Sequence, residues 1–147
     1  MTIKTILVPT DFSEPSVEAL NYAKDLATAF KASVHLLHVV QDPLTQPWGL
    51  ESYGPLPVEL LKDIKARAQK GLEESLTEAE RKTHNVTLVT VEGAPFSQIV
   101  EYAKTHPVDL IVMGTHGRGT LAHAILGSVA ERVVRFAPCP VLTVRYK

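Results

Sequence analysis

Short apolar stretches rich in β-branched residues alternate along this chain with longer stretches in which apolar residues recur every three or four positions. The first pattern is typical of strands buried on both faces, and the second of amphipathic helices. We expect strands over residues 3–9, 33–40, 86–91, 108–113 and 141–144. Because the two patterns alternate, the sequence predicts an α/β fold with a parallel sheet and helices on both of its faces.

Four helices are expected between these strands, beginning after Ser13, at Val58, after Pro95 and at Ser128. The second should run without a break to Ala79. In the other three, the residues expected to face the sheet are Val17, Leu20, Ala23, Ala27 and Phe30 in the first, Ile99, Val100 and Ala103 in the third, and Val129, Val133 and Phe136 in the last.

The composition excludes several classes of protein. The 147 residues suit one domain, 1–147. Lys plus Arg number 15 and Asp plus Glu 16, whereas binding to a nucleic acid requires a basic face. No apolar run approaches the ~20 residues of a membrane span, and the first residues lack the apolar core of a signal peptide. With a single cysteine, no internal disulfide is possible. We therefore expect a cytoplasmic protein with no nucleic acid partner and no membrane insertion.

Residues 41–57 interrupt the alternation with four prolines and two glycines, beside Trp48 and Tyr53. This composition predicts a loop. Loops of such length are usually functional or disordered. The 42–57 loop is therefore either an exposed connection or a lid over a ligand, and the sequence leaves both interpretations open.

Four of the eight glycines lie between Gly114 and Gly127, directly after the fourth expected strand. Glycine permits positive φ and a close approach of the backbone to a ligand. The residues 128–131, Ser-Val-Ala-Glu, have the pattern of a capping box, and a helix N-terminus attracts anions. Between Met113 and Arg135, three arginines stand against one glutamate. The segment predicts a phosphate site, with an ordinary flexible turn as the alternative.

The spacing Gly114-x2-Gly117-x9-Gly127-Ser128 resembles the nucleotide-binding signature of ATP-binding universal stress proteins. The resemblance extends over essentially the whole chain, through residues 6–13, 109–114 and 139–144. It implies an adenine nucleotide alpha hydrolase-like fold, an open five-stranded sheet with strand order 3-2-1-4-5. It also implies that the chain binds ATP or another adenine nucleotide, with or without Mg²⁺, and takes part in a stress response.

The same resemblance assigns roles to individual residues. Asp11 would bond to the ribose, although an Asp between a strand and a helix can also be only a turn residue. The adenine pocket would be lined by Pro9, Thr10, Val39 or Val40, Met113 and Gly114. The phosphates would be held by Gly117, Gly127, Ser128 and Val129, with His116 and Arg118 at further positions of the motif. No catalytic and no metal-binding residue is predicted.

Two other patterns have simpler explanations. Cys139 and Arg145 have the spacing of a phosphatase loop, but the residues between them predict a strand instead of the glycine-rich turn such a loop needs. His35 and His38 lie three apart on one expected strand and so point to opposite faces, which disfavours a shared metal.

In the strand order 3-2-1-4-5, the last strand lies at an edge of the sheet. Its apolar residues would need to be covered or paired, and the family commonly pairs this strand across a two-fold axis. We therefore expect a homodimer through residues 141–145.

Three functions are compatible with these features. The first is a stress-linked regulator or sensor that binds ATP with no or weak hydrolysis, because no carboxylate is clearly placed as a general base. The second is a slow ATPase or nucleotide-transferring enzyme that uses the same pocket. The third is an adaptor for an unknown protein partner, in which the nucleotide is structural. The sequence favours the first, a protein that is not an enzyme.

Overall fold

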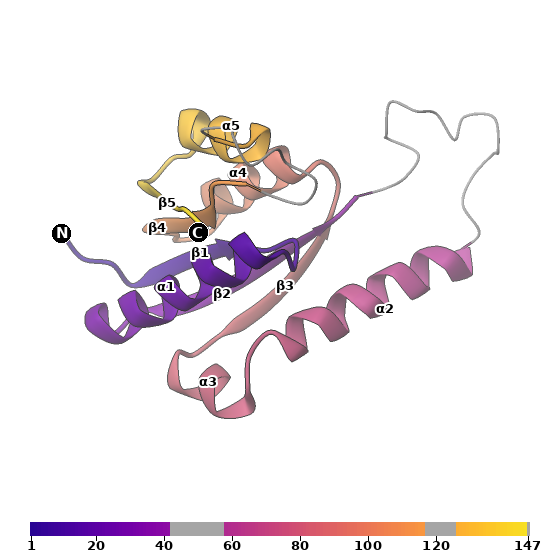
Figure 1. The fold of residues 1–147 in the computed structure, drawn as a ribbon, viewed down its shortest axis with the longest axis horizontal. Coiled ribbons are helices and arrows are strands. Elements are labelled where there is room, and N and C mark those ends of the chain that lie inside the picture. The colour runs from indigo at the N-terminus through magenta and orange to yellow at the C-terminus, as the bar shows by residue number, and fades with distance from the viewer. Residues whose placement is uncertain (42–57, 117–125, 147) are drawn as a thin grey trace.

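The computed structural model describes residues 1–41, 58–116 and 126–146. Within them lie five strands: β1 (Thr5–Pro9), β2 (Ser33–Val40), β3 (Thr87–Glu92), β4 (Leu110–Gly114) and β5 (Val141–Val144). They form one sheet in the order β3-β2-β1-β4-β5, in which all neighbouring strands are parallel (Figure 1). The predicted fold class and strand order are confirmed.

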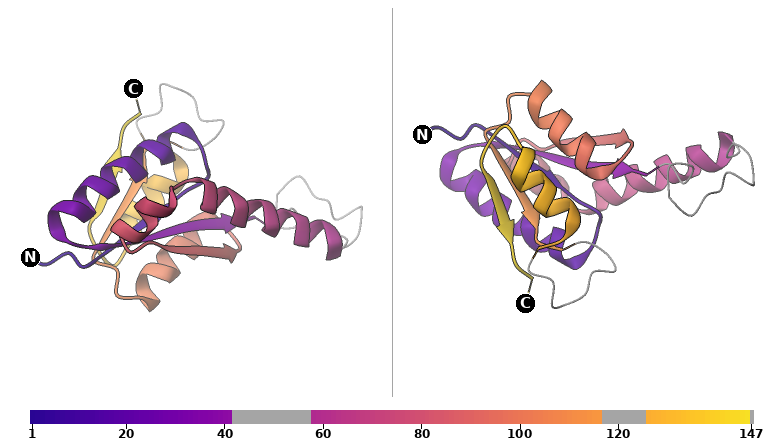
Figure 2. Two further views of the ribbon diagram at one scale, coloured as in Figure 1. Left: turned by 90° about the horizontal axis from the view of Figure 1, so that it is seen from below. Right: turned by 90° about the horizontal axis from the view of Figure 1, so that it is seen from above.

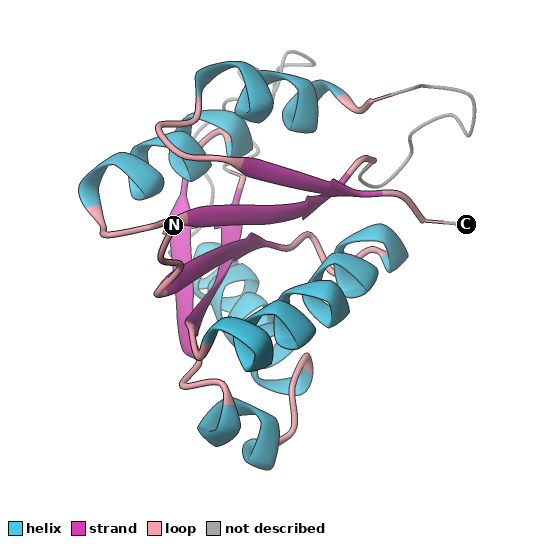
Figure 3. Ribbon diagram, turned by 90° about the vertical axis from the view of Figure 1, so that its left-hand side faces the viewer, coloured by secondary structure: helices cyan, strands magenta, loops and turns pink. Residues whose placement is uncertain are grey.

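Helices cover both faces of this sheet (Figure 2, Figure 3). On one side lie α1 (Glu14–Phe30) and α2 (Val58–Glu74), followed by the short α3 (Glu78–Thr83), and on the other side lie α4 (Pro95–Thr105) and α5 (Ser128–Phe136). Because side chains alternate along a strand, Ile6 and Val8 of β1 pack on the α1 side and Leu7 on the α4 side. None of the described helices is both long and apolar enough to cross a bilayer.

Strands β2 and β5 have the predicted bounds, whereas β1 and β4 begin two residues later than expected. The cause is a side chain that takes the place of ladder bonds. The Asp109 carboxylate accepts hydrogen bonds from the N–H groups of Lys4 at 2.8 Å and Thr5 at 3.0 Å. The segments that lead into β1 and β4 are therefore held side by side before regular backbone pairing of the two strands starts.

The second helix, predicted as one long element, is two helices. After α2 ends, Thr77 caps α3 by accepting a hydrogen bond from the Glu80 N–H at 3.1 Å. The Glu80 carboxylate accepts one from the Thr77 N–H in return, which completes a capping box. Leu76 in the break is buried, so the apolar spacing continues and conceals the end of the first helix.

The buried face of α1 differs from the predicted stripe. Val17 and Phe30 are exposed by 49% and 45%, while Ser16 and Ala19 are buried. Small residues let the helix lie close to the sheet, which excludes the larger side chains from the contact.

The buried face of α5 also differs from the prediction. Phe136 is exposed and Val129 only half-buried, whereas Ala130 and Val133 are buried. Phe136 instead contacts Phe96 of α4, with ring centroids 5.6 Å apart. The helix therefore packs its smaller residues against the sheet and Phe136 against α4.

Candidate functional site

A cavity of about 520 Å³ opens at the carboxyl edge of the sheet, where β1, β2 and β4 end and α5 begins. The chain turns from β1 to β2 on one side and later returns to β4 on the other side. This reversal of strand order is the place where open α/β sheets bind their ligands.

One wall is the loop after β1, which is held by its own side chains. The Thr10 N–H donates to the Leu37 carbonyl at 2.8 Å, and the Thr10 hydroxyl donates to Ser16 Oγ at 3.1 Å. Asp11 Oδ1 accepts hydrogen bonds from the N–H of Ser13 at 3.0 Å and from its hydroxyl. Asp11 is therefore a turn residue, and its half-buried side chain lines the cavity as well.

The opposite wall forms where the chain returns to the end of β4. The Gly127 N–H donates to the Thr115 carbonyl at 2.6 Å. A Cβ at position 127 would lie 2.9 Å from that carbonyl oxygen, closer than real Cβ atoms approach, so α5 can start here only with glycine.

The start of α5 is at Ser128, as predicted, but its cap is not the predicted one. Gly127 occupies the N-cap position with extended backbone angles, and as a glycine it has no side chain that could accept a hydrogen bond from the first turn. Ser128 is the first helical residue and is exposed, while Glu131 pairs with Arg135. The predicted capping box is therefore wrong. The N–H groups of the first turn have no partner within the helix, and they lie at the cavity.

Gly114 lines the cavity, as predicted, but the reason for a glycine at this position is not positive φ. It ends β4 without positive φ; among the described glycines, Gly93 has that conformation. A Cβ on Gly114 would lie 2.9 Å from Pro15 Cβ and 3.0 Å from the Pro15 carbonyl group. The glycine is needed here because the first turn of α1 passes directly over it, and it also lines the cavity.

The charge in the cavity is low. Among the described residues that line it, Asp11 is the one carboxylic acid, and none is a lysine or an arginine. Attraction for an anion would therefore come mainly from the positive end of α5, where the peptide dipoles sum to about half a charge.

The histidine and cysteine patterns have structural explanations. His35 Nδ1 bonds to the Tyr102 hydroxyl at 2.8 Å, on the side of the sheet away from His38. The described residues contain no group of three His, Cys, Asp or Glu that could hold a metal. Burial and, to a lesser extent, Asp109 raise the pKa of Cys139, so its thiolate is disfavoured, and the predicted strand follows it as β5.

Comparison with known proteins places this arrangement in a family. The model of the universal stress protein family matches residues 2–145. The chain belongs to this family. The universal stress protein MJ0531 of Methanocaldococcus jannaschii is 42% identical to it over 145 residues, which are 97% of this chain and 82% of that protein.

Solved universal stress proteins share the fold. UspA from Lactobacillus plantarum superposes with a TM-score of 0.83 at 30% identity, and the match covers 99% of each chain. A universal stress protein in complex with cAMP superposes with a TM-score of 0.71 at 26% identity, over 100% of both chains.

This universal stress protein brings most of the predicted site residues to one cavity: Pro9, Thr10, Asp11, Val39, Met113, Gly114, His116, Gly127, Ser128 and Val129 all line it. Of the alternatives Val39 and Val40, Val39 lines the cavity, whereas Val40 is buried and is not one of its described lining residues. Gly117 and Arg118 lie outside the described residues, as do Trp48, Tyr53 and the rest of the 42–57 loop.

Several lining residues of the universal stress protein were not predicted, among them His38, Gln41 and Thr115. His38 was considered only as a metal ligand. Its place at the carboxyl end of β2, next to β1, was the available signal that it borders a ligand cavity.

Proposed function

We propose that this universal stress protein binds an adenine nucleotide, ATP or a related one, in the cavity at the carboxyl edge of the sheet. The observation that carries the proposal is that a helix N-terminus with a glycine N-cap, at Gly127 and Ser128, meets the half-buried Asp11 in one cavity. The first suits phosphates and the second a ribose hydroxyl. The family member in complex with cAMP supports this class of ligand.

Each part of the nucleotide has candidate partners. The apolar side chains of Pro9, Val39 and Met113 would contact the base. The Ser13 N–H donates to Asp11 Oδ1. A carboxylate has about four acceptor sites, so Asp11 can also accept a hydrogen bond from a ribose hydroxyl. The N–H groups at the start of α5 and the Ser128 hydroxyl would donate to phosphate oxygens. Mg²⁺, if used, would enter with the phosphates, since this ion keeps most of its ligands outside the protein.

We propose further that the protein acts as a stress-linked regulator or sensor with no or weak hydrolysis. The support is chemical. Among the described lining residues there is one carboxylate, Asp11, and it is already engaged in the turn before α1. A hydrolase would need a base positioned to activate water, and the two histidines among these lining residues already use Nδ1, His38 toward the Thr10 carbonyl and His116 toward the Thr115 hydroxyl. Release of phosphate from ATP well above that of a Ser128→Asp variant would contradict this part of the proposal.

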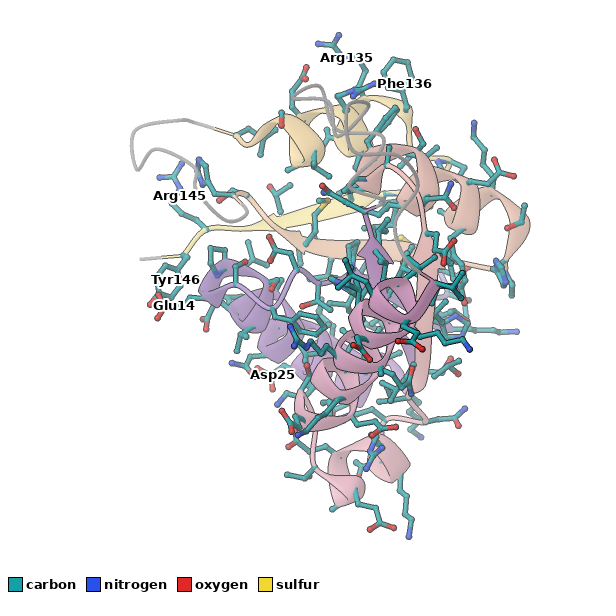
Figure 4. The ribbon with its side chains drawn as sticks, turned by 90° about the vertical axis from the view of Figure 1, so that its right-hand side faces the viewer. Glu14, Asp25, Arg135, Phe136, Arg145 and Tyr146 are labelled. Carbon is teal, nitrogen blue, oxygen red and sulfur yellow. The ribbon has the colours of Figure 1, made fainter. Side chains whose placement is uncertain are left out.

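The sheet edge supports a homodimer through β5. Among the strands that the structure describes, β5 has one neighbour, β4, and its Leu142 is 38% exposed. The segment that follows turns to α1, where the side chain of Tyr146 lies near that of Glu14 (Figure 4). An apolar edge strand with this exposure is usually paired or covered, and a second copy of the chain would pair it.

Titration calorimetry with ATP, ADP, AMP and cAMP tests the central proposal. We expect at least one to bind with micromolar to low millimolar affinity, and mass spectrometry of the purified protein to identify a bound adenine nucleotide. If all four fail to bind at millimolar concentration, the proposal is wrong. Exchange of bound nucleotide within minutes would support a sensor over an adaptor with a structural nucleotide.

A further inference from the structure

The residue after Asp11 has a backbone conformation that is unusual for its type. Phe12 has φ of 64°, in the left-handed region that bulky side chains rarely adopt. Such a conformation persists only where the surroundings impose it, and it often occurs at ligand sites. Its ring does not line the cavity but packs against the core on the α1 and α2 side of the sheet.

His38 of β2 holds this segment at two points. Its ring lies against the Phe12 ring, with centroids 4.5 Å apart and planes inclined by 32°. Its Nδ1 lies 2.8 Å from the Thr10 carbonyl oxygen. Because a carbonyl oxygen only accepts, Nδ1 carries the proton and donates it. One side chain therefore fixes both the residue before Asp11 and the residue after it.

The tip of the Phe12 ring meets α2 at Gly71. A Cβ on Gly71 would lie 2.8 Å from Phe12 Cζ and 3.0 and 3.1 Å from the two Cε atoms. Glycine is unfavourable inside a helix, and Gly71 lies within α2, three residues before its last residue, Glu74. The space that the ring occupies explains why this position has no side chain.

We propose that Phe12 is a positioning residue for the cavity. Contacts with His38 and Gly71 fix the position of the Phe12 ring. Phe12 in turn holds Thr10 and Asp11 in the conformation that faces the ligand. Helix α2, which contributes no described lining residue, thereby becomes part of the binding apparatus. The inference rests on the proposed function for the identity of the ligand, but not for the geometry of the loop.

The first test is the variant Gly71→Ala. Its methyl group must displace the ring, so we expect affinity for ATP to fall about tenfold, the size of coupling seen between residues in contact. In the Phe12→Leu background the shorter side chain leaves room, so Gly71→Ala should then change affinity by less than about twofold. Lys70→Ala, an exposed neighbour on α2, is the control and should bind ATP like the natural protein.

The second test needs no nucleotide. The N–H groups of Phe12 and Ser13 donate to Thr10 Oγ1 and Asp11 Oδ1. In Gly71→Ala we expect these amides to exchange hydrogen about tenfold faster, while the buried amide of Leu7 in β1 is unchanged. If Gly71→Ala does not fold, Phe12→Leu is measured in the same way, with the same expectation.

The outcomes separate the two proposals. Unchanged exchange at Phe12 and Ser13 overturns the positioning role, whatever the affinities. A loss of ATP affinity in Gly71→Ala that persists fully in the Phe12→Leu background overturns it too. Faster exchange in a protein that binds none of the four adenine nucleotides supports the positioning role and refutes the proposed function.

Discussion

At the start of α5, Ser128 is a position where a substitution can affect the stability of the fold and the affinity for a nucleotide differently. Ser128 is exposed, is the first residue of the helix and lines the cavity. A negative charge there would interact favourably with the helix dipole but would repel a phosphate at the same place. Stability and affinity should therefore change in opposite directions.

We predict that Ser128→Asp raises the free energy of unfolding by about 0.3–1 kcal/mol. The affinity for ATP should fall by roughly tenfold or more. Urea denaturation and calorimetry measure the two effects. Asn85→Asp adds the same charge at an exposed left-handed residue, which tolerates Asp, and should leave binding unchanged. Unaltered ATP affinity in Ser128→Asp would argue against a phosphate at this helix end.

Also at the residue scale, His35 makes stability depend on pH. Burial, and secondarily the nearby His106, lower the pKa of His35, which bonds to the Tyr102 hydroxyl. The folded protein therefore binds the proton more weakly than the unfolded chain, and protonation favours unfolding. The contribution of His35 is complete above its ordinary pKa of about 6.5 and is lost as pH falls below it.

We predict that the free energy of unfolding declines between about pH 6.5 and 5 and that His35→Gln makes this decline shallower. Urea denaturation at a series of pH values measures both proteins. The pH dependence of the free energy of unfolding has one slope in the natural protein and another in His35→Gln. The difference between the two slopes is the contribution of His35, because the carboxylates titrate equally in both proteins. Parallel slopes in the two proteins would contradict the assignment.

At the scale of elements, the break between α2 and α3 shows how a local polar pattern overrides an apolar one. The capping box at Thr77 turns α3 so that Glu80 reaches Lys24 of α1, with the ammonium 2.6 Å from the carboxylate. The hydrogen bond from Lys24 is the largest cause of the lowered pKa of Glu80. The sequence contains this box, but the continued apolar spacing favoured a single helix.

We predict that Thr77→Ala lowers the free energy of unfolding by about 1 kcal/mol, because the N–H of Glu80 loses its acceptor. Thr83→Ala, at the exposed last residue of α3, is the matched control and should change stability by less than half as much. The midpoints of urea denaturation compare the variants. Equal losses in the two proteins would mean that the cap does not stabilise α3.

At the scale of the whole molecule, the two edges of the sheet are β3 and β5. We predict that the natural protein is a dimer by light scattering and that Leu142→Asp is a folded monomer, since a charge on a paired edge opposes pairing. Val58→Asp changes an apolar residue that is 70% exposed on α2 and should leave the dimer intact. A natural protein that is monomeric at all concentrations would refute the β5 dimer.

Periodicity in the sequence alone determined the α/β class and the bounds of β2 and β5. These features are local, because neighbours along the chain decide them. Strand order and the identity of the cavity residues were reached through resemblance to a family, since no local pattern specifies which strands are neighbours.

The tertiary structure alone decided the facts that depend on contacts between distant segments. The close approach of α1 to β4 selected Ser16 and Ala19 as the buried residues and explains the glycine at 114. The bond from Gly127 to Thr115 made Gly127 the N-cap in place of Ser128. The space left by Gly71 for Phe12 joins residues 59 positions apart in the chain. Such contacts depend on shape and distance in three dimensions, which apolar spacing does not encode.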